Sequence, residues 1–287
     1  MTSSRTKAPS PWFTAPQSDR SMIRLFCFPY AGGGSLTFRT WANQFGPSVA
    51  VCPAHLPGRE GRLVENLFTR YQSLVEAVAD AILPHLDRPF AFFGHSMGAI
   101  ISFELARHLR RHNGPTPAHV FVSGRRAPHL SVNDPATYKL PDFEFKEELR
   151  RLNGTPREVL DNAELMNLII PLLKADFEVC QTYRYTHGPP LDCPISAFGG
   201  LQDRDVSSEM VEAWRQHTAG PFRRWMLPGD HFFMHSAQPH LLRILSQELA
   251  TVVTSEAASS QQRDVQPLEE RQQESCEHSL LTASKRV

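Results

Sequence analysis

The sequence predicts an α/β fold built on a mainly parallel β-sheet, because short apolar runs alternate with helical patterns along much of its 287 residues. Most of these runs are apolar throughout, as is typical of strands in a parallel sheet that is covered on both faces. With 41% hydrophobic residues, the chain can bury one large core. We therefore expect a single main domain.

Six apolar runs are the predicted strands. They are IRLFCF at 23–28, VAVC at 49–52, FAFF at 90–93, HVFVSG at 119–124, ISAFGG at 195–200 and FRRWML at 222–227. Helical patterns separate several of these runs, which is the order expected of strand–helix–strand units with parallel strands.

Two segments between the strands have clear helical signals. In residues 69–83 apolar side chains recur at steps of three and four, which predicts a helix with one face on the sheet. These side chains belong to Tyr71, Leu74, Val75, Val78 and Ile82. Thr69 and Gln72 have the spacing of a capping box. A second predicted helix begins at Met97 and ends with basic residues and Gly114, a composition typical of helix C-termini.

The segment from about 130 to 185 interrupts the alternation of strands and helices. It contains two or three helical patterns and no strand run. Because it lies between the strands at 119–124 and 195–200, we expect its helices over the edge of the sheet that carries the loops. We interpret it as a helical lid.

Charge and composition argue against several classes of function. Thirty basic residues balance thirty acidic ones, so net charge favours neither a nucleic acid nor an anionic membrane as a partner. The five cysteines are scattered without CxxC spacing, which argues against a disulfide framework or a zinc site. They are Cys27, Cys52, Cys180, Cys193 and Cys276. No run reaches the roughly 18 apolar residues of a membrane span, and the start lacks a secretory signal. We expect a monomeric cytoplasmic protein without a metal.

Both ends of the chain are polar. Residues 1–20 are rich in Ser, Thr and Pro, and residues 254–287 are rich in Gln and Glu. Such segments bury too little apolar surface to offset their ordering entropy, so we predict disordered extensions around a domain at 21–253. Apolar spacing near Leu268, Leu280 and Leu281 leaves a docking helix as an alternative.

The pentapeptide Gly94-His95-Ser96-Met97-Gly98 fits the GxSxG pattern of a nucleophile elbow. The pattern has meaning only where a strand precedes it and a helix follows, because the sharp turn between them exposes the serine hydroxyl. Both conditions hold here. We predict Ser96 as a nucleophile, the alternative being a plain strand-to-helix turn.

A nucleophilic serine needs a base and an orienting carboxylate, which on this type of fold follow in the order Ser, Asp or Glu, His. Asp203 follows the strand at 195–200 and is our candidate for the carboxylate. Its neighbour Asp205 is the rival, and it also suits the cap of the helix that follows. We favour Asp203 because of its distance to the strand.

His231 follows the last predicted strand after a short turn and is the candidate base. His235 stands four residues later, a spacing that on a helix could bind a metal, but no HExxH glutamate accompanies the two. His95 is next to Ser96 in the chain, and we interpret it as a neighbour in the turn.

Acyl attack by a serine also needs donors for the oxyanion. One predicted donor is the backbone N–H of Met97, directly after the nucleophile. The other is Ala31, in the glycine-rich loop FPYAGGGS that follows the first strand. The rival interpretation is a phosphate-binding loop, but AGGGS has neither the Walker lysine nor GxGxxG spacing.

With these residues in place, the sequence resembles the type II thioesterases that accompany polyketide synthases and nonribosomal peptide synthetases, within the α/β-hydrolase superfamily. The resemblance covers about residues 22–250. Its segments are FPYAGGGSLTFRTWA, LPGREGR, FFGHSMGA, LNGTPREVL, LLKADFEVCQTYRY, GGLQDRDV and PGDHFF. GxSxG marks only the superfamily, whereas FPYAGGG and LPGRE together with GDHFF are typical of this family.

The resemblance implies an α/β-hydrolase fold with a helical lid, a triad of Ser96, Asp203 and His231, and oxyanion donors at Ala31 and Met97. It also implies an editing enzyme that hydrolyses acyl or aminoacyl thioesters on the phosphopantetheine arm of an acyl or peptidyl carrier protein, without a cofactor of its own. The alternatives are a fatty acyl-carrier-protein or acyl-CoA thioesterase, a general carboxylesterase, and a noncatalytic carrier-binding module. We assign no catalytic role to Arg59 or Glu60.

Overall fold

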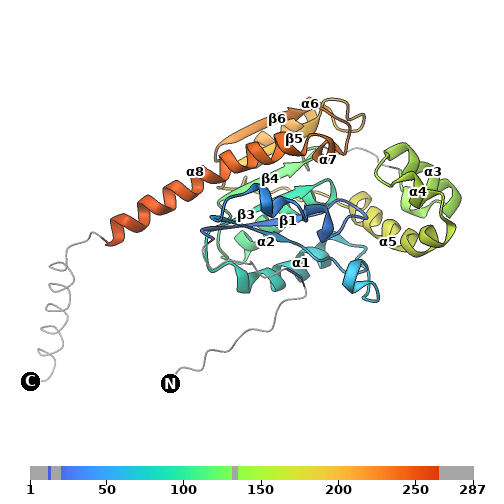
Figure 1. Cartoon of the computed structure of the whole chain (residues 1–287), viewed down its shortest axis with the longest axis horizontal. Helices are drawn as coiled ribbons and strands as arrows, with labels where there is room; N and C mark the ends of the chain where they lie inside the picture. Colours follow the sequence, from blue (N-terminus) through green and yellow to red (C-terminus); the bar gives the residue numbers. More distant parts are fainter. Residues whose placement is uncertain (1–11, 14–20, 131–134, 265–287) are drawn as a thin grey trace, which may run out of the picture. The chain divides into compact units, whose positions relative to one another are not determined.

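The computed structural model describes residues 12–13, 21–130 and 135–264. Within them, six parallel strands form one sheet in the order β2-β1-β3-β4-β5-β6 (Figure 1). The strands are β1 (Ile23–Phe28), β2 (Val49–Pro53), β3 (Phe90–His95), β4 (His119–Ser123), β5 (Ile195–Gly200) and β6 (Phe222–Leu227). The predicted α/β fold with a parallel sheet is confirmed.

The position of each strand in the sheet explains its composition. Every residue of β1, β3, β4 and β5 is buried, so most positions in these strands are apolar. The strands β2 and β6 lie at the two edges and are partly exposed. β6 accordingly carries Arg223 and Arg224 on solvent-exposed positions.

Eight α-helices occur in the described residues. They are α1 (Tyr71–Ile82), α2 (Met97–Arg111), α3 (Asp142–Leu152), α4 (Arg157–Leu160), α5 (Ala163–Gln181), α6 (Ser208–Glu212), α7 (Phe233–Ser236) and α8 (Gln238–Asp264). Short 3₁₀ helices lie at Ser35–Phe38, Trp41–Gln44, Glu60–Arg62, Leu83–His85, Thr137–Lys139 and Ala213–His217. The helix α2 packs on β1, β3 and β4, and α1 packs on α2. None of the described helices has the length and apolar character of a membrane span.

The predicted helix at 69–83 is confirmed, but its predicted cap is wrong. Leu74, Val75, Val78 and Ile82 are buried along one face of α1. The helix begins at Tyr71, and its N-cap position is occupied by Arg70, without a side-chain hydrogen bond. Thr69 therefore lies one residue too early to cap it.

The end of α2 differs from the prediction in one detail. Asn113, rather than Gly114, adopts the left-handed conformation, with φ of 54°. The N–H of Gly114 then donates to the Leu109 carbonyl at 2.8 Å. This is the hydrogen bond of a Schellman motif, which Asn closes here in place of glycine.

The predicted helical insertion is confirmed between β4 and β5, where α3, α4 and α5 occur and no strand lies among the described residues. We call the segment 135–181 the lid. Its helices share a small apolar cluster of their own, formed by Phe145, Leu149, Leu160, Met166, Ile170 and Leu173. In Figure 1 the lid is the green-to-yellow group of helices. The lid therefore has its own packing and is not an irregular loop.

The chain divides into two compact units between Ser246 and Gln247. The helix α8 begins in the first unit and continues to Asp264, past the predicted domain end at 253. Inside the predicted N-terminal extension, Phe13 is buried and packs edge-on against Phe26, with ring centroids 5.1 Å apart. The other residues of 1–20, and the possible helix around Leu268, Leu280 and Leu281, lie outside the described residues.

The order of the strands decides where a site can form. The chain moves from β1 to β2 on one side and then to β3 on the other, so connections leave the carboxyl ends of β1 and β3 in opposite directions. In open α/β sheets such a reversal leaves a crevice that binds ligands. The glycine-rich loop follows β1 and Ser96 follows β3, so both lie at this crevice.

Candidate active site

Ser96 is the single residue between β3 and α2. Its φ of 54° and ψ of −106° place it in a conformation that residues other than glycine rarely adopt. Its N–H donates to the Ser123 carbonyl at 2.7 Å, which helps to hold the turn. The sharp strand-to-helix turn predicted for Ser96 is confirmed.

The two glycines of the pentapeptide are required by backbone contacts. A Cβ on Gly94 would lie 1.9 Å from the Gly98 carbonyl oxygen, and a Cβ on Gly98 would lie 2.0 Å from the carbonyl oxygen of Phe28. Any larger residue would push α2 away from the strands. These glycines let the start of α2 approach β1 and β3 closely enough to form the turn at Ser96.

His231 and Asp203 form a hydrogen-bonded pair, with His231 Nδ1 2.8 Å from Asp203 Oδ2. The Asp203 side chain is only 1% exposed. Its other oxygen accepts the N–H groups of Asp205 at 2.9 Å and Val206 at 3.1 Å. Burial raises the pKa of Asp203, but His231 and these two N–H groups outweigh it, so the net shift in pKa is downward. The carboxylate is therefore held ionised beside the imidazole.

The rival residue Asp205 makes no such pair. Its carboxylate lies 3.4 Å from Arg151 of α3, and its side chain is 47% exposed. The predicted capping role is also wrong, because Ser207 caps α6 by accepting the N–H of Met210. Asp205 lies two residues too early to reach that N–H.

The two other histidines considered in the sequence, His235 and His95, contact residues other than Asp203. His235 Nε2 lies 3.1 Å from the Tyr30 hydroxyl, whereas His231 pairs with Asp203. This arrangement does not bring His231 and His235 together as metal ligands. His95 is fully buried, and its Nδ1 lies 2.9 Å from the Ser123 hydroxyl. It is the last residue of β3 and so directly precedes the turn at Ser96, which agrees with the prediction.

The loop after β1 contains a tight turn. The N–H of Gly33 donates to the Tyr30 carbonyl at 2.9 Å, and Gly32 has φ of +79°. A positive φ at the third residue is what a type II turn requires, and glycine adopts it without strain. Ala31 occupies the second position of this turn and lines the same pocket as Ser96. Met97 is the first residue of α2, where backbone N–H groups have no acceptor within the helix.

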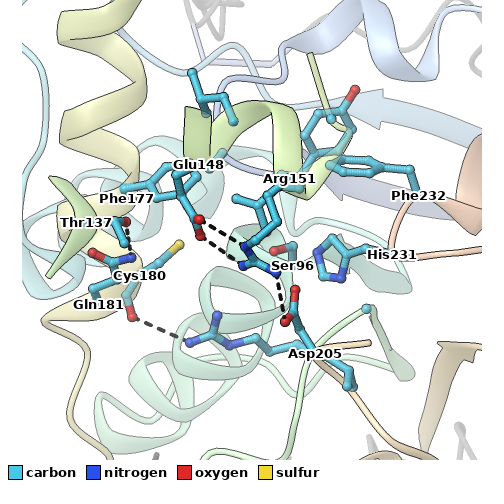
Figure 2. A pocket seen from close by; sticks show the side chains of 18 of the residues that line it. Ser96, Thr137, Glu148, Arg151, Phe177, Cys180, Gln181, Asp205, His231 and Phe232 are labelled. Atoms are coloured by element: carbon cyan, nitrogen blue, oxygen red, sulfur yellow. Dashed lines mark hydrogen bonds and ion pairs between the residues drawn. The ribbon is translucent and has the colours of Figure 1, made fainter. Parts of the chain in front are cut away.

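A cavity of about 410 Å³ brings these residues together. Ser96, His231 and Ala31 line it, and the lid contributes several side chains to its wall (Figure 2). Part of that wall is charged, because Arg151 pairs there with Glu148 at 2.8 Å and with Asp205. A serine, a histidine and an ion-pair network therefore line the same cavity.

Two further residues at this site were not predicted to act together. Arg59 and Asp176 are 117 positions apart and form a buried two-pronged ion pair, with both N–O distances 2.9 Å. Asp176 lies on α5, and Arg59 lies in the segment LPGREGR. Their residue types carried no signal of pairing, because the lid and this segment meet only in the folded chain.

Comparisons with known proteins agree on one family. A family model described as a thioesterase domain matches residues 23–249. The gramicidin S biosynthesis protein GrsT of Aneurinibacillus migulanus is 46% identical, covering 84% of this chain and 95% of GrsT. The RedJ thioesterase of the prodiginine pathway in Streptomyces coelicolor is 43% identical with a TM-score of 0.77, covering 85% of this chain and 96% of RedJ. The type II thioesterase BorB from the borrelidin cluster is 31% identical with a TM-score of 0.77, covering 85% and 99%.

Proposed function

The chain belongs to the thioesterase family, and from that premise we propose that it is an editing enzyme which removes acyl or aminoacyl groups from the phosphopantetheine arm of a carrier protein. One observation carries the proposal: Ser96 lies in a strained strand-to-helix turn and shares a cavity with His231, which pairs with Asp203. The similarity to GrsT, RedJ and BorB, which are named for biosynthetic pathways, supports a carrier-bound substrate.

The proposed reaction has two half-reactions at Ser96. Because Asp203 accepts the Nδ1–H of His231, the Nε2 atom is left to take the proton of the Ser96 hydroxyl as its oxygen attacks the thioester carbonyl. The tetrahedral intermediate then collapses, the C–S bond breaks and His231 returns the proton to the departing thiolate. The result is an acyl-enzyme and a free phosphopantetheine thiol.

The second half-reaction frees the acid. His231 takes a proton from a water molecule as its oxygen attacks the acyl-enzyme, and then returns that proton to Ser96 as the ester C–O bond breaks. In both steps the backbone N–H groups of Ala31 and Met97 are proposed to stabilise the oxyanion. This cycle needs no cofactor, because phosphopantetheine arrives with the carrier protein.

A hydrolysis assay tests the proposal. Acyl and aminoacyl carrier proteins, the matching N-acetylcysteamine thioesters and an oxygen ester are offered to the native chain and to Ser96→Ala. We expect carrier-bound thioesters to have the highest kcat/KM and Ser96→Ala to lose at least 10³-fold, about 4 kcal/mol of transition-state stabilisation. Ser73→Ala, an exposed position on α1, is the matched control and should retain full activity.

Two outcomes would contradict the proposal. Equal rates for Ser96→Ala and the native chain would remove the serine from the mechanism. A clear preference for oxygen esters, or for free acyl-CoA over carrier-bound chains, would leave a hydrolase of a different scope.

A further inference from the structure

The loop that carries Ala31 is held by residues of the lid and of the segment LPGREGR. The N–H of Gly32 donates to Asp176 Oδ2 at 2.7 Å. Arg59 Nη1 donates to the Gly33 carbonyl at 2.7 Å and to the same Asp176 oxygen at 2.9 Å, while its Nη2 donates to Asp176 Oδ1. The two side chains are 7% and 6% exposed. Because both side chains are buried, these charge-assisted hydrogen bonds are stronger than they would be in water.

These contacts determine the orientation of successive peptide planes. The peptide between Tyr30 and Ala31 is trans and planar, and its carbonyl accepts the N–H of Gly33 inside the turn. Its N–H, which belongs to Ala31, therefore points away from the interior of the turn. The next peptide is held by Asp176 through the N–H of Gly32, so rotation about Ala31 is restricted from both sides.

The lid also contacts this loop directly. A Cβ on Gly32 would lie 2.4 Å from Leu173 Cδ2, so α5 packs against the backbone of the turn. Leu173 and Asp176 are three residues apart on α5 and so lie on the same side of the helix. The turn is therefore held between this face of α5 and Arg59.

Glu60 holds the other end of the loop. Its Oε2 accepts the hydroxyl proton of Ser35 at 2.7 Å, and its Oε1 accepts the N–H of Leu36 at 2.9 Å. Arg59 and Glu60 are adjacent in the chain, and they contact the two halves of the glycine-rich loop after β1. The segment LPGREGR therefore fixes this loop at both ends.

We infer that Arg59 and Asp176 are positioning residues that hold the Ala31 N–H as an oxyanion donor, and that α5 of the lid must be docked for the donor to be in place. The inference rests on the proposed function and gives the lid a role at the oxyanion donor. If α5 moves away, the carboxylate leaves with it and the turn loses the acceptor for Gly32. An undocked lid therefore leaves the nucleophile present but its oxyanion poorly stabilised.

The test removes the ion pair without leaving an unpaired buried charge. In the double variant Arg59→Met with Asp176→Leu, apolar groups of similar size replace both partners, a change that proteins often tolerate. The control double variant is Glu104→Leu with Arg107→Met, which removes another buried ion pair, 4% and 6% exposed, within α2. Asp176→Asn is a third variant, which keeps an acceptor for Gly32 but leaves Arg59 without its counter-charge.

The assay uses a small acyl N-acetylcysteamine thioester together with an acyl trifluoromethyl ketone, whose hemiketal with Ser96 mimics the tetrahedral intermediate. We expect the Arg59/Asp176 double variant to lose about 100-fold in kcat, the effect of losing one oxyanion donor, while KM changes by less than about threefold. The Ki of the ketone should rise in step with the loss in kcat/KM, because both depend on the oxyanion. Asp176→Asn should lie between the double variant and the native chain.

Thermal unfolding establishes that each variant is folded, and Asp176→Asn decides the question if the double variant is not. Unchanged kcat and Ki in a folded variant would overturn the inference, as would an equal loss in the Glu104/Arg107 control. A native chain that hydrolyses the small thioester but no carrier-bound thioester would refute only the proposed carrier substrate. The two failures are thus distinguishable.

Discussion

The assignment of Asp203 can be tested by exchanging two neighbouring carboxylates for amides. In Asp203→Asn, the side-chain oxygen can still accept the N–H groups of Asp205 and Val206, which lie 2.9 and 3.1 Å from Asp203 Oδ1. The amide NH₂ then occupies the position of Oδ2, 2.8 Å from His231 Nδ1. A donor at this position forces Nδ1 to act as an acceptor and moves the ring proton to Nε2. The imidazole can then no longer accept the proton of Ser96.

The expected loss follows from this change of tautomer. A triad with the wrong histidine tautomer loses about 10⁴-fold in kcat, which corresponds to about 5.4 kcal/mol at 1.36 kcal/mol per factor of ten. Asp205→Asn removes a half-exposed carboxylate in the cavity wall, 3.4 Å from Arg151, and leaves the contact between Asp203 and His231 in place. Exposed ion pairs contribute at most about 1 kcal/mol, so this control should retain activity within about fivefold.

Thiol release from an acyl N-acetylcysteamine thioester, followed with a chromogenic disulfide, measures both variants. Urea unfolding establishes that they are folded. Our assignment would be wrong if Asp203→Asn stayed within tenfold of the native chain, or if Asp205→Asn lost more activity than Asp203→Asn.

Three further predictions concern the turn at Ser96, the contacts of Glu60 with the glycine-rich loop, and the wall of the cavity. Gly98→Ala should lower the free energy of unfolding, measured in urea, by about 1–3 kcal/mol and should abolish thioester hydrolysis. The reason is that its Cβ would lie 2.0 Å from the Phe28 carbonyl oxygen. A stable, active variant would contradict this. Burial raises the pKa of Glu60, but hydrogen bonds to the carboxylate outweigh it and lower the pKa below 4.5. The ionised Glu60 carboxylate therefore adds stability above pH 4.5, and this stability is lost as the pH falls through the lowered pKa. Glu60→Gln should have a smaller free energy of unfolding than the native chain at pH 7, and the two should become similar in acid. A difference in unfolding free energy that does not change with pH would contradict this. Arg151→Met removes the cation that pairs with Glu148 and Asp205 in the cavity wall, and should raise kcat/KM for octanoyl relative to acetyl thioesters by about tenfold; an unchanged ratio would show that Arg151 does not limit apolar chains.

The strands were predictable because a strand that is buried on both faces has mostly apolar residues. A fully buried parallel strand such as β3 must be apolar at nearly every position, so its run is visible without any neighbour. The turn at Ser96 was partly predictable for a related reason, since Gly94 is required by a backbone contact with Gly98, only four residues later, whereas the contact that requires Gly98 is with the distant Phe28. Local rules also had limits. The capping box at Thr69 and the cap at Asp205 fitted by spacing, but each lay one or two residues from the position that the chain used.

From the sequence alone came the strand–turn–helix setting of Ser96, and the order in which Asp203 and His231 follow it at strand ends, because parallel strands deliver their loops to one edge of the sheet. Only the tertiary structure decided which carboxylate pairs with His231. That choice depends on the direction in which the loop after β5 turns, with Asp203 buried beside the imidazole and Asp205 facing Arg151. The tertiary structure also brought Arg59 to Asp176 across 117 residues. A buried ion pair of this kind produces no periodic pattern in the sequence. The residues next to Arg59 or Asp176 in the chain do not indicate which partner each will contact in the folded protein.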